Sequence, residues 1–144
     1  MPRLLVDANI FLELELGQSR AAECREFLSG VARGKIKATT TDFILDSIGV
    51  IMEDRGSPPT DIAKFFSSLT FFKGLLIHNL GLVGRVKAAH EMENQNLSFD
   101  DSTSVAAMRS LDIKEIVSFD RDFDKVRGVA RIEPGTVISR IQSG

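Results

Sequence analysis

The stretch LLVDANIF, residues 4–11, decides the fold of this chain. Three branched apolar residues, enough for a short buried strand, run into Asp7, and apolar residues then return at helical spacing. A strand at residues 3–6 is therefore expected to lead directly into a helix at residues 9–16. Asp7 stands at their junction, where it can cap the helix, because aspartate is a favoured N-cap residue. It also stands at the carboxyl end of a strand, where open parallel sheets bind ligands.

The order of strand followed by helix recurs along the chain. Apolar residues at helical spacing predict further helices at residues 20–33, at 42–54, at 61–72, up to about 94, and at 97–113. Short β-rich or apolar runs predict strands at residues 35–41, 74–80, 114–120 and 129–133, and the run at 74–80 is expected to be buried. Such alternation predicts right-handed βαβ units. We therefore expect one α/β domain at residues 1–144, a three-layer α/β/α architecture with four or five mostly parallel strands.

Composition excludes several classes of protein. A chain of 144 residues with 43% hydrophobic and 26% charged residues matches an ordinary globular domain. No apolar run approaches the ~18 residues of a membrane span, and no signal-peptide pattern opens the chain, so a cytoplasmic protein without a membrane partner is expected. The single cysteine, Cys24, excludes an intrachain disulfide and is expected to be buried. A net charge of −2 leaves nucleic-acid binding to a local site.

Acidic residues follow the predicted strands at the edge where ligands bind. These acids are Asp7 after the first strand, Asp42 and Asp46 after the second, and Asp120 and Asp122 after the strand at 114–120. Each also has a purely structural interpretation. Asp42 and Asp46 fit a solvated helix stripe, and Asp120 and Asp122 fit a turn.

A further acid opens the helix at 97–113. Ser98 and Asp101 match the S-x-x-D capping box, which is a structural interpretation of this acid. Asp101 lies four residues before Val105 and shares its inward face, whereas Asp100 does not. Of the two, Asp101 is therefore the better candidate for the site.

Carboxylates gathered at one edge would repel each other by several kcal/mol in a partly desolvated cleft unless a cation lies between them. Oxygen ligands without cysteine suit Mg²⁺, with Mn²⁺ as the alternative, rather than zinc. His78 and His90 lie near no acidic cluster in the sequence and are expected to be structural or surface residues. A metal held by carboxylates can activate water and clamp a phosphodiester, so phosphodiester hydrolysis is the natural chemistry.

Four segments together resemble the PIN-domain nucleases, and among them the VapC-type toxins of toxin–antitoxin pairs, especially archaeal members. The segments are LLVDANIFLELELGQ, TTTDFILDSI, LSFDDSTSVAAM and EIVSFDRDF. The resemblance runs over nearly the whole chain and implies a Mg²⁺-dependent endoribonuclease, in which metal-activated water attacks RNA. It also implies a homodimer and a small antitoxin that inserts into the acidic groove.

The resemblance assigns a role to each acid. Asp7 matches the acid that closes the first strand, and Asn9 matches the small polar residue that orients it. Asp101 matches the third acid, which with Asp7 contacts the metal. Asp46 stands where the family usually has glutamate, and Asp42 is the alternative for this second acidic position.

The fourth segment completes the implied site. Asp120 matches the acid of the T-x-D motif and is a further metal ligand, Ser118 replaces the usual threonine, and Asp122 is an accessory acid. The resemblance implies that Asp46 or Asp120 positions or deprotonates the attacking water. The bases expected to bind the RNA backbone, unless they form only a solvated charged face, are Arg121, Lys125, Arg127 and Arg131.

Three alternatives were weighed against this interpretation. A haloacid-dehalogenase-type phosphatase needs a second aspartate as a general acid at position 9, where an amide stands. A receiver domain needs paired acids after the first strand and a lysine after the last, and neither is found there. A PIN-like protein that processes or binds RNA without an antitoxin, or that has lost catalysis, keeps the fold and is the stronger alternative.

Overall fold

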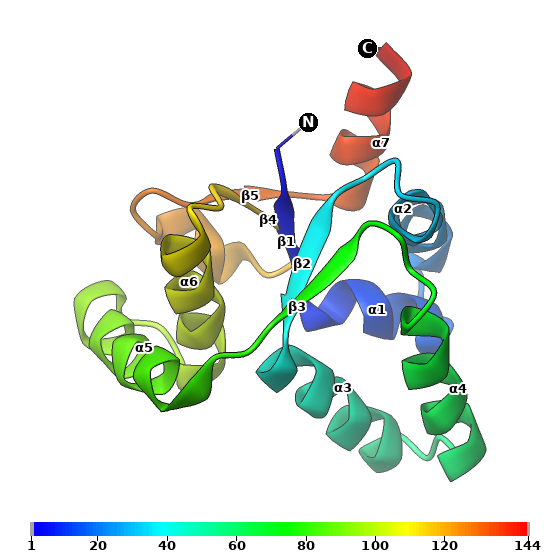
Figure 1. Cartoon of the computed structure of the whole chain (residues 1–144), viewed down its shortest axis with the longest axis horizontal. Coiled ribbons are helices and arrows are strands. Elements are labelled where there is room, and N and C mark those ends of the chain that lie inside the picture. The colour runs from blue at the N-terminus through cyan, green and yellow to red at the C-terminus, as the bar shows by residue number, and fades with distance from the viewer. Residues whose placement is uncertain (1, 144) are drawn as a thin grey trace.

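A computed structural model describes residues 2–143 and has a five-stranded parallel sheet at its centre (Figure 1). The strand order is β3-β2-β1-β4-β5, and every neighbouring pair is parallel. The strands are β1 (Leu4–Val6), β2 (Ala38–Thr41), β3 (Leu75–His78), β4 (Glu115–Val117) and β5 (Ala130–Ile132). The predicted α/β architecture with a mostly parallel sheet is confirmed.

Helices cover both faces of this sheet and make the three layers. One side carries α1 (Ala8–Glu15), α2 (Ala21–Ala32), α3 (Asp42–Asp54) and α4 (Pro59–Leu69), and the other carries α5 (Gly81–Gln95) and α6 (Phe99–Leu111) (Figure 1). A short 3-10 helix, η1 (Arg121–Lys125), follows β4, and α7 (Pro134–Ser143) packs against α2. The sequence analysis did not predict η1 or α7. None of the helices in residues 2–143 combines the length and apolar character that a membrane span requires.

The central strand β1 is buried because its side chains alternate between two apolar layers. Leu4 and Val6 face the layer of α1, α2 and α3, whereas Leu5 packs in the layer of α6 with Val105 and Ile116. A strand buried on both faces is continuously apolar, which explains the run before Asp7. Each such side chain contributes about 1.5–3 kcal/mol by leaving water. This burial fixes the position at which the chain turns out of the sheet.

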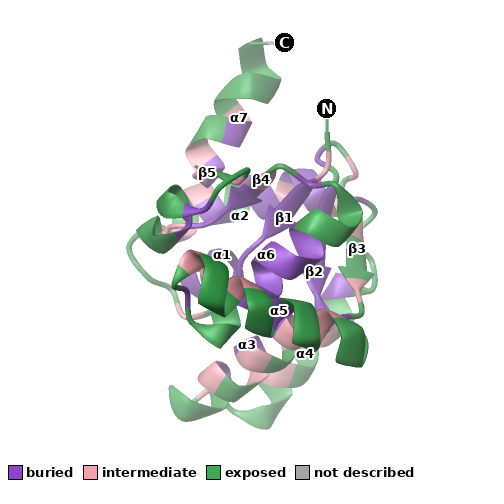
Figure 2. Cartoon of the chain, turned by 90° about the vertical axis from the view of Figure 1, so that its left-hand side faces the viewer, coloured by how far each residue is buried: buried purple, intermediate pink, exposed green. Residues whose placement is uncertain are grey.

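The strand β3 differs from the expectation that it is buried. It forms an edge of the sheet, and Leu76 and Ile77 are 57% and 51% exposed. Figure 2 shows β3 at the outside of the sheet beside the exposed helix α5. The apolar run GLLIHNL resembles a central parallel strand in composition, but position in the sheet decides burial. Cys24, in contrast, is fully buried as expected.

Candidate metal centre

The carboxyl ends of β1 and β4 lie side by side and place Asp7 next to the segment after Val117. The Asp7 amide donates to the Val117 carbonyl oxygen (3.1 Å). Asp7 also caps α1, because its Oδ1 accepts from the Ala8 amide at 2.8 Å. The capping interpretation of Asp7 is therefore confirmed, and the same residue lies at the ligand-binding edge of the sheet.

A buried hydroxyl joins the two strand ends. The Ser118 Oγ donates to Asp7 Oδ2 at 2.6 Å and accepts from the Asp120 amide at 3.0 Å. The Asn9 amide nitrogen contacts the same Asp7 Oδ2 (3.2 Å) and Ser118 Oγ (3.1 Å), and Asn9 Oδ1 accepts from the Phe119 amide (3.3 Å). These contacts hold Asp7 in one orientation, which is the role expected for Asn9, and Ser118 shares in it.

Asp7 carries a carboxyl group in an environment that disfavours its charge. Burial raises the pKa of Asp7 to about 6 against the hydrogen bonds from Ser118 and Ala8, and the charges of Asp100 and Asp120 raise it further. A bound cation would stabilise the ionised form of such a group.

Two more carboxylates project from the start of α6. Ser98 caps this helix, since its Oγ accepts from the Asp101 amide at 3.1 Å, as the capping-box pattern predicted. Burial, followed by the charges of Asp120 and Asp7, raises the pKa of Asp101 to about 7. The pKa of Asp100 is also raised, by burial and then by Asp120. Asp101, which the sequence analysis favoured, therefore lies among the acids of the site.

Three acids of the site could hold a metal ion together. Within residues 2–143, Asp101, Asp120 and Asp122 each offer a carboxylate oxygen, and these three oxygens lie within 4.8 Å of one another. Asp120 caps η1 and accepts from the Asp122 amide at 2.9 Å, so both acids follow β4 in one tight turn. An all-oxygen set of like charges suits a hard divalent cation. The residues present therefore fit the divalent cation expected from the sequence, Mg²⁺ or Mn²⁺.

The two candidates for the second acidic position are Asp42 and Asp46, both in α3. Asp42 Oδ1 accepts from the amides of Phe43 (2.9 Å) and Leu80 (3.1 Å), so this carboxylate ties the start of α3 to the loop before α5. Asp46 is exposed on α3. The charges that raise the pKa values of Asp7 and Asp101 come from other acids, and neither Asp42 nor Asp46 contributes. A role for either residue stays a prediction.

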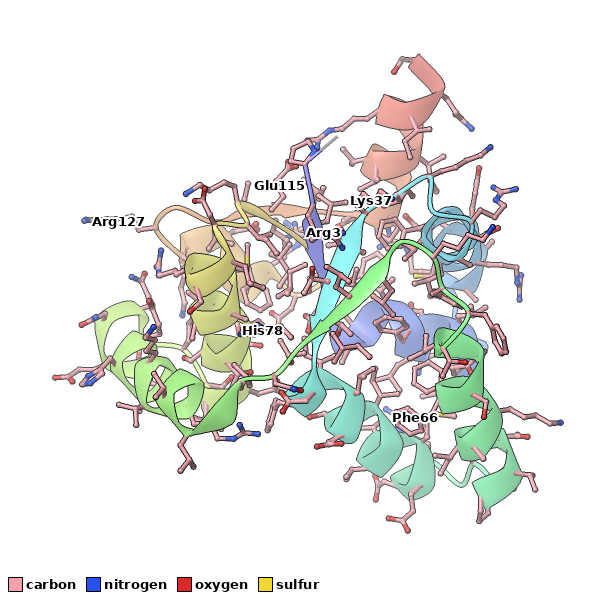
Figure 3. All side chains as sticks on the ribbon, viewed as in Figure 1. Arg3, Lys37, Phe66, His78, Glu115 and Arg127 are labelled. Atoms are coloured by element: carbon pink, nitrogen blue, oxygen red, sulfur yellow. The ribbon has the colours of Figure 1, made fainter. Side chains whose placement is uncertain are left out.

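The four bases expected to bind RNA have different surroundings. Arg121 is exposed directly after Asp120, and Arg127 points outward at the edge of the molecule (Figure 3). Lys125 donates to the Asn96 carbonyl oxygen at 3.0 Å. Arg131 is nearly buried, pairs with acids on both sides and donates to the Ser118 carbonyl oxygen at 3.0 Å. This placement favours a structural role for Arg131 behind the site.

Asp100 precedes Asp101 at the start of α6 and was not among the predicted site residues. Asp100 raises the pKa of both Asp7 and Asp101, and Ser104 and Ala107, which align with it on the helix, are buried. The middle of α6 is buried on every side, from Ser102 to Met108, so helical periodicity does not separate an inward face from an outward one. Two consecutive acids at a helix N-terminus, where the dipole favours negative charge, were the available signal. His78 ends β3 and His90 is exposed on α5, and neither belongs to the cluster of Asp101, Asp120 and Asp122.

The fold and the acids define a class of parallel α/β domain with a candidate divalent-cation site at the carboxyl ends of its strands. Comparison with models of protein families matches residues 4–129 to the PIN domain. The chain therefore belongs to the PIN domain family, as the resemblance of its four segments predicted. No curated protein sequence gives a significant match.

Several solved structures have the same fold at low sequence identity. VapC20 of Mycobacterium tuberculosis, described as a toxin that cleaves the sarcin–ricin loop, is 18% identical, covering 91% of this chain and 99% of its own, with a TM-score of 0.73. A toxin–antitoxin complex from Klebsiella pneumoniae is 14% identical, covering 91% and 97%, with a TM-score of 0.67. VapBC2 from Rickettsia felis, bound to promoter DNA, is 12% identical, covering 92% and 98%, with a TM-score of 0.65. At these identities the likeness shows the fold alone.

Proposed function

We propose that the protein is a Mg²⁺-dependent endoribonuclease, with Mn²⁺ as the alternative ion, and the toxin of a toxin–antitoxin pair. The observation that carries the proposal is the convergence of Asp101, Asp120 and Asp122 beside the buried Asp7 in a PIN domain. Acids that raise each other's pKa values in this way are typical of functional sites rather than of folding alone. The four acids together make a candidate for metal-assisted hydrolysis of a phosphodiester.

A count of the lone pairs on the two Asp7 carboxylate oxygens indicates which oxygen can bind a metal ion. Its Oδ2 accepts from both Ser118 and Asn9, which uses both lone pairs of that oxygen. Its Oδ1 accepts only from the Ala8 amide among the described residues, so one lone pair is left for a cation. We assign Asp7, Asp101 and Asp120 as the residues that would hold the metal, with Asp122 as a nearby accessory acid.

The remaining residues orient the reacting groups. A divalent cation, when bound here, would lower the pKa of a water ligand and offset charge on the phosphodiester. Ser118 fixes the Asp120 amide and Asp7 together, so both carboxylates keep their positions through the reaction. We assign proton acceptance from the attacking water to the Asp120 carboxylate. Asp46 is the alternative acceptor implied by the family resemblance, and Arg121 is the favoured contact to the RNA backbone.

The partners are proposed on fold similarity. The VapC20 structure is described as a toxin that cleaves an RNA loop, and two other similar structures are toxin–antitoxin assemblies, which supports RNA as the substrate and a small antitoxin as the partner. Support for a homodimer comes from an apolar patch on α5 formed by Leu82, Val83 and Val86, of which Leu82 is 83% exposed. We place this activity in the cytoplasm, where an RNA substrate is available.

An RNA cleavage assay tests the function directly. Purified protein is incubated with structured and unstructured RNA in Mg²⁺, in Mn²⁺ and in EDTA, and products are mapped at single-nucleotide resolution. We expect cleavage with either metal and none in EDTA. Asp7→Asn and Asp101→Asn should each lose activity by at least a hundredfold, whereas Asp54→Asn, an exposed acid at the end of α3, serves as the matched control.

Two results of this assay would contradict the mechanism. Cleavage that persists in EDTA would show that no divalent cation is needed. Full activity in both substituted proteins would show that the cluster is not the active site. An upstream gene for a small protein with a DNA-binding N-terminus would support the toxin assignment, and its absence would favour a PIN-like protein that processes RNA without an antitoxin.

A further inference from the structure

A groove of about 530 Å³ lies directly beside the candidate metal centre. Asn9 lines it, and the same Asn9 amide contacts Asp7 and accepts from the Phe119 backbone. Helices α1 and α3 supply its other walls through Leu12 and Ile51. A ligand in the groove could therefore contact Asn9, which itself contacts the Asp7 carboxylate. The inference below rests on the proposed function, since it concerns the RNA bound at that centre.

The groove contains a buried carboxylate without a partner. Glu13 lines the groove and is only 9% exposed, and its Oε2 is buried with no hydrogen-bond partner among the described residues. A buried, unpaired carboxylate is costly and rare in folded proteins. Arg20 lines the same groove, but Glu23 (2.5 Å) and Glu133 (2.8 Å) hold its guanidinium. Glu13 therefore lies in the wall of the groove with an unpaired oxygen, and its side chain must turn toward the groove before Oε2 can accept from an entering group.

The remaining lining residues select the chemistry of that group. Arg55 lines the groove and would repel a cationic peptide side chain while attracting a ligand that carries phosphate, whereas Glu23 and Glu133 offset the charge of Arg20. Phe119 adds an aromatic ring, with the Arg20 guanidinium carbon 4.1 Å from its centre. Nucleobases stack on aromatic rings and on guanidinium planes in single-stranded RNA recognition. A carboxylate, an aromatic ring and two arginines together match a nucleotide.

We infer that this groove binds a guanine base of the RNA, in the nucleotide next to the bond that is cut, and that Glu13 determines this preference. An ionised carboxylate only accepts hydrogen bonds. Guanine presents two neighbouring N–H donors on its Watson–Crick edge, which match the two carboxylate oxygens. Adenine, cytosine and uracil each turn at least one acceptor toward the carboxylate, which would repel it. Glu13 is a specificity residue of the binding groove and takes no part in the hydrolysis.

Binding without catalysis tests this assignment. The full-length protein is titrated in EDTA with the ribonucleotides UpGpU, UpApU, UpCpU and UpUpU, and affinities are measured by calorimetry or NMR. We expect UpGpU to bind about tenfold more tightly than the others, as one bidentate base contact provides. Glu13→Gln should abolish the preference, because glutamine offers one acceptor oxygen and one donor. Glu15→Gln, an exposed acid in the same helix, should retain it.

Three outcomes would overturn the assignment. Equal affinity for the four trinucleotides would show that the groove does not prefer guanine. An unchanged preference in a folded Glu13→Gln protein would show that Glu13 does not determine it. Stronger, Glu13-dependent binding of an acetylated arginine peptide would assign the groove to a protein ligand instead. These results are independent of the cleavage assay, since a guanine preference without any metal-dependent cleavage would contradict only the proposed nuclease activity.

Discussion

Replacement of Asp7 by asparagine should stabilise the metal-free protein at alkaline pH. Asp7 is only 9% exposed, and its pKa rises from 3.8 to about 6 on folding, which corresponds to about 3 kcal/mol. Because the folded chain holds this proton more tightly, the contribution of Asp7 to stability is complete below pH 4 and is lost as the pH rises through about 6. Asparagine has no charge to bury and still caps α1.

The expected gain is smaller than the full 3 kcal/mol. The new amide nitrogen would face the Asn9 amide and the Ser118 hydroxyl, which both now donate to Asp7 Oδ2, and these two mismatches cost about 1–2 kcal/mol together. We therefore expect Asp7→Asn to be more stable than the original protein by about 1–2 kcal/mol at pH 8 in EDTA, with no gain near pH 4. Urea unfolding at both pH values measures the difference, and Asp54→Asn should change stability by less than about 0.5 kcal/mol. A less stable Asp7→Asn protein at pH 8 would refute this account of Asp7.

Three further changes test the site and the fold. Mg²⁺ at roughly a hundred times its Kd should stabilise the original protein by about 3 kcal/mol at pH 8, and thermal unfolding should show no such shift in Asp101→Asn. Ser118→Ala removes the hydroxyl that bridges Asp7 and the Asp120 amide. We therefore expect its free energy of unfolding in urea to fall by about 1–3 kcal/mol and its RNA cleavage to be reduced. Ser118→Thr keeps a hydroxyl and should retain cleavage. In Gly74→Ala the new methyl group would overlap the Ile36 carbonyl oxygen, so we expect the free energy of unfolding to fall by more than about 3 kcal/mol. Gly49→Ala is the control, because its new methyl group inside α3 lies at ordinary contact distance from Phe66. It should change the free energy of unfolding by less than about 1 kcal/mol in the same assay.

Local patterns predicted most of the fold. The apolar run before Asp7 identified β1 because a strand buried on both faces needs no polar residues, and the helix at 42–54 was predicted with its observed bounds. The burial of β3 was predicted wrongly, since its residues match a central strand and only the strand order shows that it is an edge. The last helix, α7, was missed because its contacts with α2 lie more than a hundred residues away in sequence.

The candidate site was predicted in part. Asp7 and Asp120 follow strands, and Asp101 opens a helix. The sequence pattern therefore predicted that all three lie at the edge formed by the carboxyl ends of the parallel strands. Asp100 was left out because Ser104 and Ala107, which align with it, were expected to face away from the core, whereas the structure buries both. Glu13 was missed altogether, since a lone acid on an amphipathic helix gives no signal until the packing around it shows that it is buried and unpaired.

The hydrogen bond from Ser118 to Asp7 joins residues 111 positions apart. A break in the loop between α4 and β3, for example at the exposed Phe71, would leave Asp7 on one fragment and Asp101 with Asp120 on the other. Neither fragment alone would contain the full set of carboxylates. During synthesis the same separation means that the ribosome must complete β4 before the centre exists. Two inactive halves whose reassociation restores RNA cleavage would make this domain a natural scaffold for a split reporter of protein association.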